Sequence, residues 1–418
     1  MDEPPVAAAR HHRAAGAGAG VDLMNPPLTG STLTSAEREA AVTVTVYPQL
    51  ALDPSRAAGC EIFTRDGRQI LDLYGGHAVA ALGYSHPRLM QALDDQTRRL
   101  LFQSNAVALD VRAAAAEALT AIAPPSLTRA FFVNSGAEAN ENALRIACRA
   151  TGRGKVLALT HGFHGRTAAA AAVTWNAAET WYGFPRLPFD VDFIPRNDVH
   201  AAAAMIDDSV AAVIFEPVQG VAGAFDLDPD FVNSLRRHCS DHGALLIADE
   251  VQSGMGRSGQ FFACGVFGVE PDLLTSAKSL GGGFPCGAVL CREDLGTALK
   301  VGDLGSTFGG GPLAAAAILA VIGTIRDEDL LANVRAREAE IREHCVTGPV
   351  TAVQGMGLLL GLVCDRPARE VHAALLEHDI LTGTSADPNV LRLLPPLVLQ
   401  QHHVGRLADT LAAIVPAT

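Results

Sequence analysis

The stretch DLLTSAKSLGGGFPCG, residues 272–287, places a lysine directly after a short apolar run and directly before a glycine-rich turn. The chain holds only three lysines in 418 residues, Lys155, Lys278 and Lys300. The apolar run is typical of a buried β-strand, so we expect Lys278 at a strand end inside the protein. Burial disfavours an ammonium group, lowers its pKa and leaves an amine that can bond to a carbonyl cofactor. The alternative is a surface lysine beside a glycine-rich turn.

Four further apolar runs resemble this one, and longer alanine-rich helical stretches separate them. Such alternation predicts an α/β fold with a mostly parallel sheet, whose strands are covered on both faces. The five expected strands are 129–133, 155–160, 211–218, 244–249 and 272–277.

Residues that could take part in binding or catalysis stand at the end of each expected strand. In open α/β sheets, ligands bind outside the carboxyl ends of the strands, so we expect the five ends to form one site. The residues at or after these ends are Ser135, Gly136, Ala137, His161, Phe163, His164, Arg166, Glu216, Asp249 and Lys278.

Asp249 ends its strand among apolar residues, where an ionised carboxylate is costly unless it is paired. A protonated pyridine nitrogen would pair with it, although the N-cap of a helix is an equally simple role. Ser135 and Gly136 open an expected helix, and helix N-termini bind phosphate, although Ser135 alone also suits a plain N-cap. A lysine, an aspartate and a phosphate cradle together match pyridoxal phosphate.

The composition argues against several other classes of protein. Nucleic-acid binding needs clustered lysine or arginine, and with a net charge of −13 no nucleic-acid partner is expected. The eight cysteines form no CxxC pair, which predicts no metal site and indicates reduced thiols in a cytoplasmic protein. No signal peptide and no membrane-spanning stretch are expected.

Changes in texture divide the chain into four expected parts. Residues 1–38 read as a flexible tail rich in alanine, glycine and proline. Residues 39–75 are expected to join a smaller α+β domain formed by 312–418, and 76–311 are expected to form the large domain. The expected elements of the smaller domain are a helix-like run at 312–344 and short strands within 351–364 and 390–399.

Taken in order, the motifs resemble those of the class III pyridoxal-phosphate aminotransferases, in the branch with acetylornithine and ornithine aminotransferases. The resemblance implies the PLP-transferase fold (fold type I, aspartate-aminotransferase-like), pyridoxal 5'-phosphate as cofactor, and a homodimer with shared active sites. The motifs are LDLYGGHAV (71–79), NSGAEANENAL (134–144), FHGRT (163–167), EPVQG (216–220), LLIADEVQSGMGRSG (245–259), DLLTSAKSLGGGFP (272–285), GSTFGG (305–310) and NVLRLLPPL (389–397).

The resemblance assigns roles around the cofactor ring. Lys278 is implied to be the lysine that bonds to the cofactor and shuttles the proton, and Asp249 to pair with the pyridine nitrogen. Val251 is implied to pack under the ring and Phe163 to stack on its other face. Gln252 is implied to reach the phenolic oxygen.

The resemblance also assigns residues to the phosphate. Gly136 and Ala137, beside Ser135, are implied to offer backbone N–H groups to it. Thr307 is implied to reach the phosphate of the neighbouring subunit. Glu216 completes the implied cofactor-binding set.

Substrate carboxylates are implied to bind two arginines, since the planar fork of arginine pairs bidentately with a carboxylate. Arg392 resembles the residue that binds the α-carboxylate of glutamate or 2-oxoglutarate, although a packed structural role is the alternative. Arg166 resembles the residue for the distal carboxylate. His77 is implied to lie near the carboxylate or acyl end of the amino donor.

Two further positions depart from the common pattern. Val221 stands after EPVQG, where most members carry a glutamate thought to mask the arginine that matches Arg392. Without that glutamate, Arg392 is expected to stay available and selection for free ornithine is not expected. Cys148 stands where acetylornithine enzymes often carry an arginine, and Arg149 should point elsewhere on a helix.

The implied activity is that of an N2-acylornithine 5-aminotransferase of arginine biosynthesis, with 2-oxoglutarate as amino acceptor and an acetyl or succinyl group on the donor. The alternatives are an ornithine transaminase, another ω-amino acid transaminase of the 4-aminobutyrate type, and a pyridoxal-phosphate-binding protein without catalysis.

Overall fold

The computed structural model describes residues 34–414, and the chain divides into two units, Met1–Asp53 and Pro54–Thr418. In the described part of the first unit, α1 (Ser35–Ala40) is capped by Thr34. The Thr34 hydroxyl accepts a hydrogen bond from the Glu37 N–H, and the Glu37 carboxylate accepts one from the Thr34 N–H. Most of the tail predicted for residues 1–38 lies outside the described residues.

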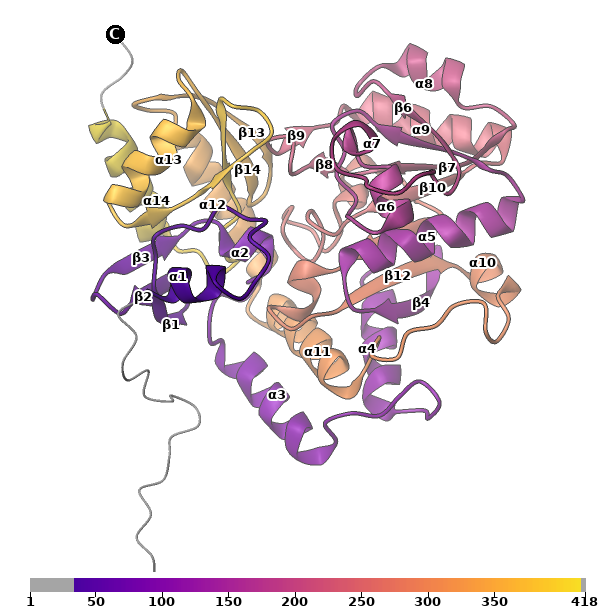
Figure 1. Ribbon diagram of the computed structural model, residues 1–418, viewed down its shortest axis with the longest axis horizontal. Coiled ribbons are helices and arrows are strands. Elements are labelled where there is room, and N and C mark those ends of the chain that lie inside the picture. The colour runs from indigo at the N-terminus through magenta and orange to yellow at the C-terminus, as the bar shows by residue number, and fades with distance from the viewer. Residues whose placement is uncertain (1–33, 415–418) are drawn as a thin grey trace, which may run out of the picture. The chain divides into compact units, whose positions relative to one another are not determined.

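A seven-stranded sheet dominates the second unit, in the order β4-β12-β11-β10-β7-β5-β6 (Figure 1). β12 is antiparallel to both of its neighbours, and the other pairs are parallel, so the predicted α/β fold with a mostly parallel sheet is confirmed. The strands are β4 (Leu127–Val133), β5 (Lys155–Leu159), β6 (Asp190–Ile194), β7 (Val210–Phe215), β10 (Leu245–Asp249), β11 (Leu273–Ser276) and β12 (Gly287–Arg292).

The five predicted strands are all present, but β5 and β11 end one residue early and β7 ends three residues early. β7 stops at Phe215 instead of continuing to residue 218. Pro217 has no N–H to donate to a neighbouring strand, and the Glu216 side chain accepts hydrogen bonds from backbone groups beyond the sheet. β6 and β12 were not predicted from the sequence.

Helices cover the sheet. α5 (Gly136–Thr151) contacts β4, β7, β10, β11 and β12, and α9 (Pro229–His242) contacts β7 and β10. Every residue of β7 and β10 is buried, as expected for strands covered on both faces. The other helices and 3-10 turns before residue 311 are α2 (Gly75–Ala78), α3 (Pro87–Arg99), α4 (Asp110–Ala121), α6 (Ala168–Ala172), α7 (Ala177–Thr180), α8 (Val199–Met205), α10 (Glu293–Ala298), η1 (Ala263–Phe267) and η2 (Lys278–Gly281).

Two four-stranded sheets and one two-stranded sheet accompany the large sheet. β3 pairs in parallel with β15, which joins residues before 75 to the C-terminal part of the chain. The expected division into four parts stays a prediction. The strands are β1 (Pro54–Ala58), β2 (Glu61–Thr64), β3 (Gln69–Asp72) and β15 (Ile380–Leu381); β13 (Val350–Met356), β14 (Leu359–Cys364), β17 (Val390–Leu393) and β16 (Gly383–Thr384); and β8 (Val218–Gln219) and β9 (Phe225–Asp226).

The helix-like run predicted at 312–344 is helical, and it forms two helices. α11 (Pro312–Asp327) and α12 (Leu330–His344) are separated at Asp329, whose φ of 50° is left-handed. Aspartate tolerates this backbone conformation better than most residues. α11 contacts α3 and α4, whereas α12 contacts α14 (Gln401–Ala413), and α13 (Ala368–Glu377) contacts β15.

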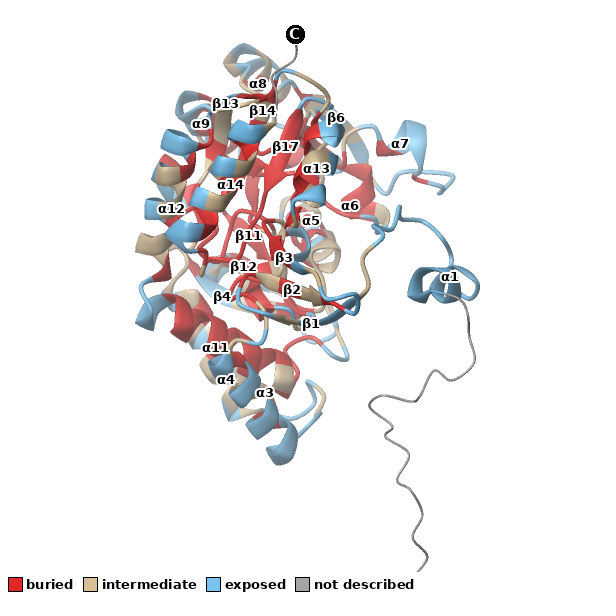
Figure 2. Ribbon diagram, turned by 90° about the vertical axis from the view of Figure 1, so that its left-hand side faces the viewer, coloured by how far each residue is buried: buried red, intermediate tan, exposed pale blue. Residues whose placement is uncertain are grey.

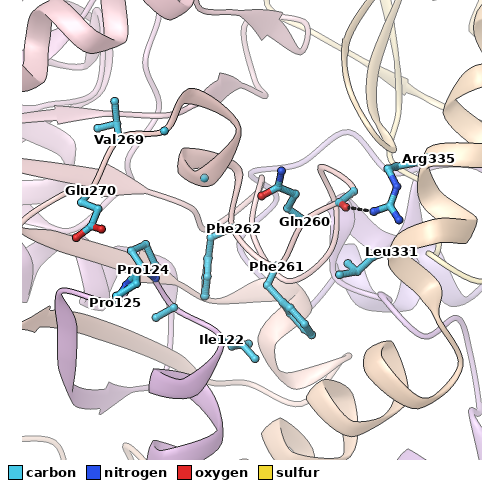
Figure 3. A pocket seen from close by; sticks show the side chains of 14 residues that line it. Ile122, Pro124, Pro125, Gln260, Phe261, Phe262, Val269, Glu270, Leu331 and Arg335 are labelled. Carbon is cyan, nitrogen blue, oxygen red and sulfur yellow. Dashed lines mark hydrogen bonds between the residues drawn. The ribbon is translucent and has the colours of Figure 1, made fainter.

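A cavity of about 610 Å³ lies beside the turn after α4, the loop of residues 259–270 and the start of α12 (Figure 3). Arg335 lines the cavity, and its guanidinium donates a hydrogen bond to the carbonyl of Gly259 at 2.7 Å. None of the residues that the sequence singled out lines this cavity.

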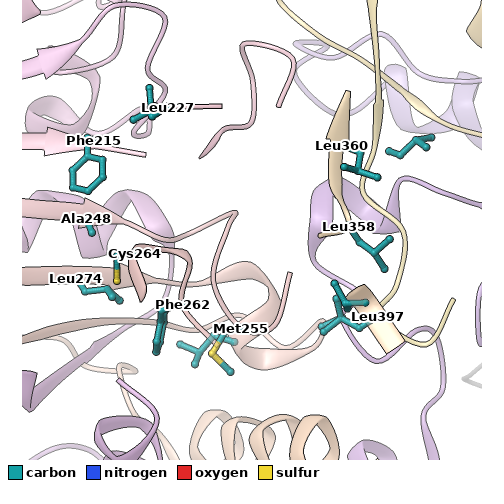
Figure 4. Packing of buried hydrophobic residues seen from close by; sticks show 14 of the residues in the cluster. Phe215, Leu227, Ala248, Met255, Phe262, Cys264, Leu274, Leu358, Leu360 and Leu397 are labelled. Atoms are coloured by element: carbon teal, nitrogen blue, oxygen red, sulfur yellow. The ribbon is translucent and has the colours of Figure 1, made fainter. Parts of the chain in front are cut away.

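Buried apolar side chains hold the strand ends in place. Figure 2 shows the middle strands β11 and β12 of the large sheet buried, whereas β4 and β6 at its edges are partly exposed. Phe215, Ala248 and Leu274, from three neighbouring strands, belong to one cluster with Leu358 and Leu397 (Figure 4). Close packing of this kind resists displacement, so side chains at the strand ends start from fixed positions. Between residues 34 and 414, no helix combines the length and apolar character that a membrane crossing requires.

Candidate active site

Asp249 is the last residue of β10, and its side chain is 3% exposed. One carboxylate oxygen accepts a hydrogen bond from the Asn140 amide at 2.7 Å and lies 2.7 Å from Nδ1 of His164. The other oxygen accepts the N–H of Val251 at 3.0 Å. These partners fix the carboxylate at the carboxyl edge of the sheet, as the sequence predicted for a strand-end aspartate.

Lys278 follows β11 and opens η2, with a left-handed φ of 47° that is unusual for a residue with a side chain. Burial lowers the pKa of Lys278, while the negative charges of Asp249 and Glu216 oppose that shift. The positive charges of Arg392 and Arg257 lower the pKa further. The environment therefore favours a neutral, nucleophilic amine.

Glu216 lies between the lysine and the backbone of two loops. Its carboxylate accepts hydrogen bonds from the N–H of Phe163 at 2.9 Å and of Gly220 at 3.2 Å. Burial raises the pKa of Glu216 to about 7, and the nearby His164 opposes the rise. Glu216 thus holds the Phe163 loop against the sheet edge.

The start of α5 contacts two of the other predicted segments. Ser135 is the N-cap, and its hydroxyl accepts the N–H of Glu138. A β-carbon at Gly136 would lie 2.7 Å from Cγ1 of Val251, and one at Gly165 would lie 2.7 Å from Cβ of Ala137. The helix start, the Val251 turn and the Phe163 loop therefore meet, with no room for side chains at the two glycines.

Gln252 is buried, and its Oε1 has no hydrogen-bond partner within the described residues. The Gln252 side chain lies against Gly220, where a β-carbon would come within 1.6 Å of Oε1. A buried polar atom without a partner is costly, so this oxygen is suited to a ligand.

Arg392, on β17, is 7% exposed and completes the group near Lys278. Its Nε donates to the carbonyl of Thr384 at 2.7 Å, one terminal nitrogen to the carbonyl of Gly220 at 3.3 Å, and the other to the hydroxyl of Tyr74 at 3.0 Å. The Tyr74 hydroxyl lies 2.7 Å from Nδ1 of His77.

Arg166 and Thr307 are less closely engaged. The exposed Arg166 places its guanidinium carbon 5.0 Å from the ring centre of Phe163 and 5.4 Å from that of Trp181. Thr307 is exposed on the loop before α11, and the neighbouring Ser306 accepts a hydrogen bond from the Asn134 amide at 3.2 Å. The predicted contact of Thr307 with a neighbouring subunit stays a prediction.

Three residues of the site received no role from the sequence. His164 stood at a predicted strand end but was not assigned, and Asn140 and Tyr74 were overlooked. Asn140 lies four residues after Gly136 and so on the same face of α5, where a buried polar residue among alanines was the available signal. Tyr74 gave no signal, because only the fold brings it to Arg392.

The residues present fit pyridoxal phosphate. The N–H groups of Gly136 and Ala137 form no hydrogen bond within residues 34–414, and they stand at the positive end of a 16-residue helix that suits a phosphate. Asp249 suits a pyridinium N–H and Lys278 suits an aldehyde. In the described part of the chain, no three His, Cys, Asp or Glu side chains gather in a way that could hold a metal ion.

Comparisons with known proteins agree with this geometry. Residues 42–415 match the family model described as aminotransferase class-III. The chain is 41% identical over 363 residues to the acetylornithine aminotransferase of Methanopyrus kandleri, covering 85% of this chain and 93% of that protein.

Two solved structures share the fold. The ornithine aminotransferase of Toxoplasma gondii, described with partial occupancy of PLP at its active site, has a TM-score of 0.84 and 28% identity, covering 90% of this chain and 93% of that one. The acetylornithine aminotransferase of Elizabethkingia anophelis has a TM-score of 0.81 and 28% identity, covering 90% and 97%. The chain therefore belongs to the class-III aminotransferases.

Proposed function

We propose that this protein is a pyridoxal-phosphate-dependent N2-acylornithine 5-aminotransferase of arginine biosynthesis. It moves the δ-amino group of the donor to 2-oxoglutarate, giving the semialdehyde and glutamate. The observation that carries the proposal is a half-buried lysine of lowered pKa placed near two carboxylates and near an arginine that lacks a carboxylate partner within residues 34–414. The choice of an acylated ornithine as amino donor rests on the relatives that bear the name acetylornithine aminotransferase.

The residues divide the work by position. Bound pyridoxal phosphate supplies an aldehyde that takes up the amino group and a protonated ring that withdraws electrons. Asp249, held by Asn140 and His164, keeps the ring nitrogen protonated. Lys278 would hold the cofactor through its amine, and that amine could carry a proton to and from the reacting carbon. The N–H groups at the start of α5 hold the phosphate.

Arg392 binds the α-carboxylate of 2-oxoglutarate or glutamate, and Arg166 binds a distal carboxylate. Arg392 suits its role because all three of its hydrogen bonds go to uncharged oxygens. Its positive charge is therefore left for a substrate to neutralise. The exposed Arg166, beside the rings of Phe163 and Trp181, is free to reach outward to a substrate.

The active enzyme is proposed to be a homodimer of the cytoplasm, with Thr307 reaching the neighbouring site. Phe102 and Phe308 are 41% and 64% exposed, and their ring centres lie 5.1 Å apart. They line an apolar cavity of about 480 Å³ together with Asn134, which directly precedes the start of α5. An apolar surface so close to the phosphate-binding turn suits contact with a second copy. All eight cysteines are free thiols, which fits a reducing compartment.

Steady-state kinetics with a panel of amino donors test the proposal. Acetylornithine, succinylornithine, ornithine and 4-aminobutyrate are compared with 2-oxoglutarate as acceptor. The expected result is the highest kcat/KM for one of the acylated donors. A higher kcat/KM for ornithine or 4-aminobutyrate would move the protein to the corresponding alternative, and no turnover with any donor would favour a binding protein without catalysis.

A further inference from the structure

The guanidinium of Arg392 is held without losing its charge. Its partners are the carbonyls of Thr384 and Gly220 and the hydroxyl of Tyr74, and none of these is an anion. Three of the five N–H groups of an arginine are used in this way, which leaves one on each terminal nitrogen for a bidentate carboxylate. The hydroxyl of Tyr74 is the only side-chain partner among these three, and a hydroxyl can rotate.

The Tyr74 hydroxyl has a defined acceptor for the hydrogen bond that it donates. An arginine can only donate, so the Tyr74 oxygen accepts from Arg392 at 3.0 Å and its own proton remains to be donated. The atom in reach is Nδ1 of His77, at 2.7 Å. Nδ1 accepts a hydrogen bond from this hydroxyl only when His77 is neutral and carries its hydrogen on Nε2.

The charge states of both rings agree with this arrangement. Partial burial lowers the pKa of His77, although its side chain stays accessible, and the positive charges of Arg392, Lys278 and Arg166 lower it further. Burial raises the pKa of Tyr74, against the opposing effect of Arg392. His77 is thus held neutral and Tyr74 is held as a phenol.

The backbone is shaped to bring the two rings together. Gly75, Gly76, His77 and Ala78 have φ values of 54°, 58°, 65° and 64°, a left-handed run that side chains rarely adopt. One carboxylate oxygen of Asp72 accepts the N–H groups of Tyr74 and Gly75, at 2.7 and 2.9 Å. The other accepts the hydroxyl of Tyr84 at 2.5 Å. Conformational strain that is held in place by buried contacts marks functional positions.

We propose that His77 is a positioning residue that acts on the substrate carboxylate through Tyr74. By accepting a hydrogen bond from the Tyr74 hydroxyl, His77 turns the lone pairs of that oxygen toward Arg392. The hydroxyl then steadies the arginine fork without neutralising it, which keeps the fork ready for an incoming carboxylate. The inference rests on the proposed function in so far as the carboxylate is that of 2-oxoglutarate or glutamate.

The test measures binding of glutarate, a five-carbon dicarboxylate that carries neither an amine nor a ketone, to the holoenzyme by isothermal titration calorimetry. Tyr74→Phe removes a hydrogen bond to a charged group and is expected to weaken binding by roughly 10-fold or more. His77→Leu leaves the hydroxyl unoriented and is expected to weaken it by about 3- to 10-fold. His77→Asn, which keeps an acceptor near the Nδ1 position and tolerates a left-handed backbone, is expected to restore most of the affinity.

The double variant Tyr74→Phe/His77→Leu decides between positioning and mere packing. If His77 acts through Tyr74, the double variant binds glutarate no more weakly than Tyr74→Phe alone. Additive losses, an unchanged affinity in His77→Leu, or no rescue by His77→Asn would overturn the proposal. Should His77→Leu not fold, His77→Gly, which adopts a left-handed backbone without strain and offers no acceptor, replaces it in the single and the double variant.

Steady-state kinetics give a second readout on the same variants. The KM for 2-oxoglutarate is expected to rise in Tyr74→Phe and His77→Leu while kcat at saturation changes less than about twofold, because the contacts of Lys278 and Asp249 are left intact. A fall in kcat alone would contradict the role. This test can be told apart from the test of the proposed function. Glutarate binding does not depend on the amino donor, so it can be measured even if acylornithines show no activity in the donor panel.

Discussion

At the scale of single residues, the site depends on an environment that lowers the pKa of one amine. Lys278 is half-buried, and burial outweighs the two carboxylates that would otherwise raise its pKa. Lys155, by comparison, is paired with Asp192 at 3.0 Å near the opposite end of its strand. The same residue type therefore carries reactivity at one position and surface charge at another.

Replacing Lys278 by alanine is expected to keep the fold and abolish turnover, because no other described amine is placed among the strand ends. The visible absorbance that marks a cofactor joined to the lysine should disappear as well. Absorption spectra and steady-state rates check both expectations. Lys155→Ala is the matched control and should retain both signals, and full turnover in Lys278→Ala would falsify the proposed mechanism.

Val221 is the residue whose identity we expect to set the choice of donor. The carbonyl of Gly220, its neighbour, accepts a hydrogen bond from Arg392 at 3.3 Å. A carboxylate introduced by Val221→Glu would compete for that arginine, so the KM for 2-oxoglutarate is expected to rise about tenfold, the equivalent of roughly 1.4 kcal/mol. Activity on free ornithine is expected to increase.

Val221→Gln has nearly the same shape without the charge and serves as control for the Val221→Glu variant. Kinetics on both substrates are compared for the two variants. Equal behaviour of Glu and Gln at this position would reduce Val221 to a packing residue.

At the scale of elements, the sequence predicted the strands that carry the chemistry better than those that complete the sheet. β10 and β11 are continuous apolar runs that end in Asp249 and lead into Lys278, so their pattern was plain. β6 has an alternating, partly exposed pattern, and β12 follows a glycine-rich turn, so neither stood out. The break at Asp329 was hidden because helix formers flank a single left-handed residue.

The pattern of residues predicted the site where a motif and a strand end coincided, whereas the resemblance alone pointed to Gln252 and Arg392. Asp249, Lys278 and Gly136 satisfy both conditions. Tyr74 and Asn140 reach the site through contacts between segments far apart in the sequence, such as the 3.0 Å hydrogen bond between Tyr74 and Arg392. No local pattern encodes such a contact.

The start of α14 carries a testable dependence on pH. Nδ1 of His403 accepts the N–H of Gln400, the N-cap residue, at 3.0 Å. Burial lowers the pKa of His403 to about 4 from its ordinary 6.5, and His402 and Arg406 reinforce the shift. Between these two pKa values, His403 is protonated in the unfolded chain but not in the folded chain. The protein therefore loses stability as the pH falls from about 6.5 toward 4.

His403→Gln keeps an acceptor for the Gln400 N–H but cannot take up a proton. Its free energy of unfolding in urea should therefore fall less than that of the unaltered protein between pH 6.5 and 4.5. One proton contributes at most about 1.4 kcal/mol per pH unit, and solvent screening at the helix end reduces this. Parallel pH profiles for the two proteins would contradict the assignment.

At the scale of the whole molecule, the proposed dimer should depend on the aromatic pair Phe102 and Phe308. A charge inserted there would have to be buried on association, so Phe102→Asp is expected to weaken the dimer roughly 30-fold or more. Light scattering after size exclusion should show monomers, and activity should fall with dissociation because Thr307 can no longer reach a neighbouring site.

Val346→Asp provides the control for the dimer prediction. Val346 is 46% exposed, comparable to Phe102, but does not line the cavity beside α5. It should leave the molecular mass and the activity unchanged. A fully active monomer in Phe102→Asp would remove the need for a shared site.

Gly220 connects residues of the candidate site that lie far apart in the sequence. Its N–H donates to Glu216, its carbonyl accepts from Arg392, and its missing side chain makes room for Gln252. The two peptide groups on either side of one α-carbon thus contact both Glu216 and Arg392. Replacing Gly220 by any residue with a side chain would therefore displace Gln252 and strain both hydrogen bonds together.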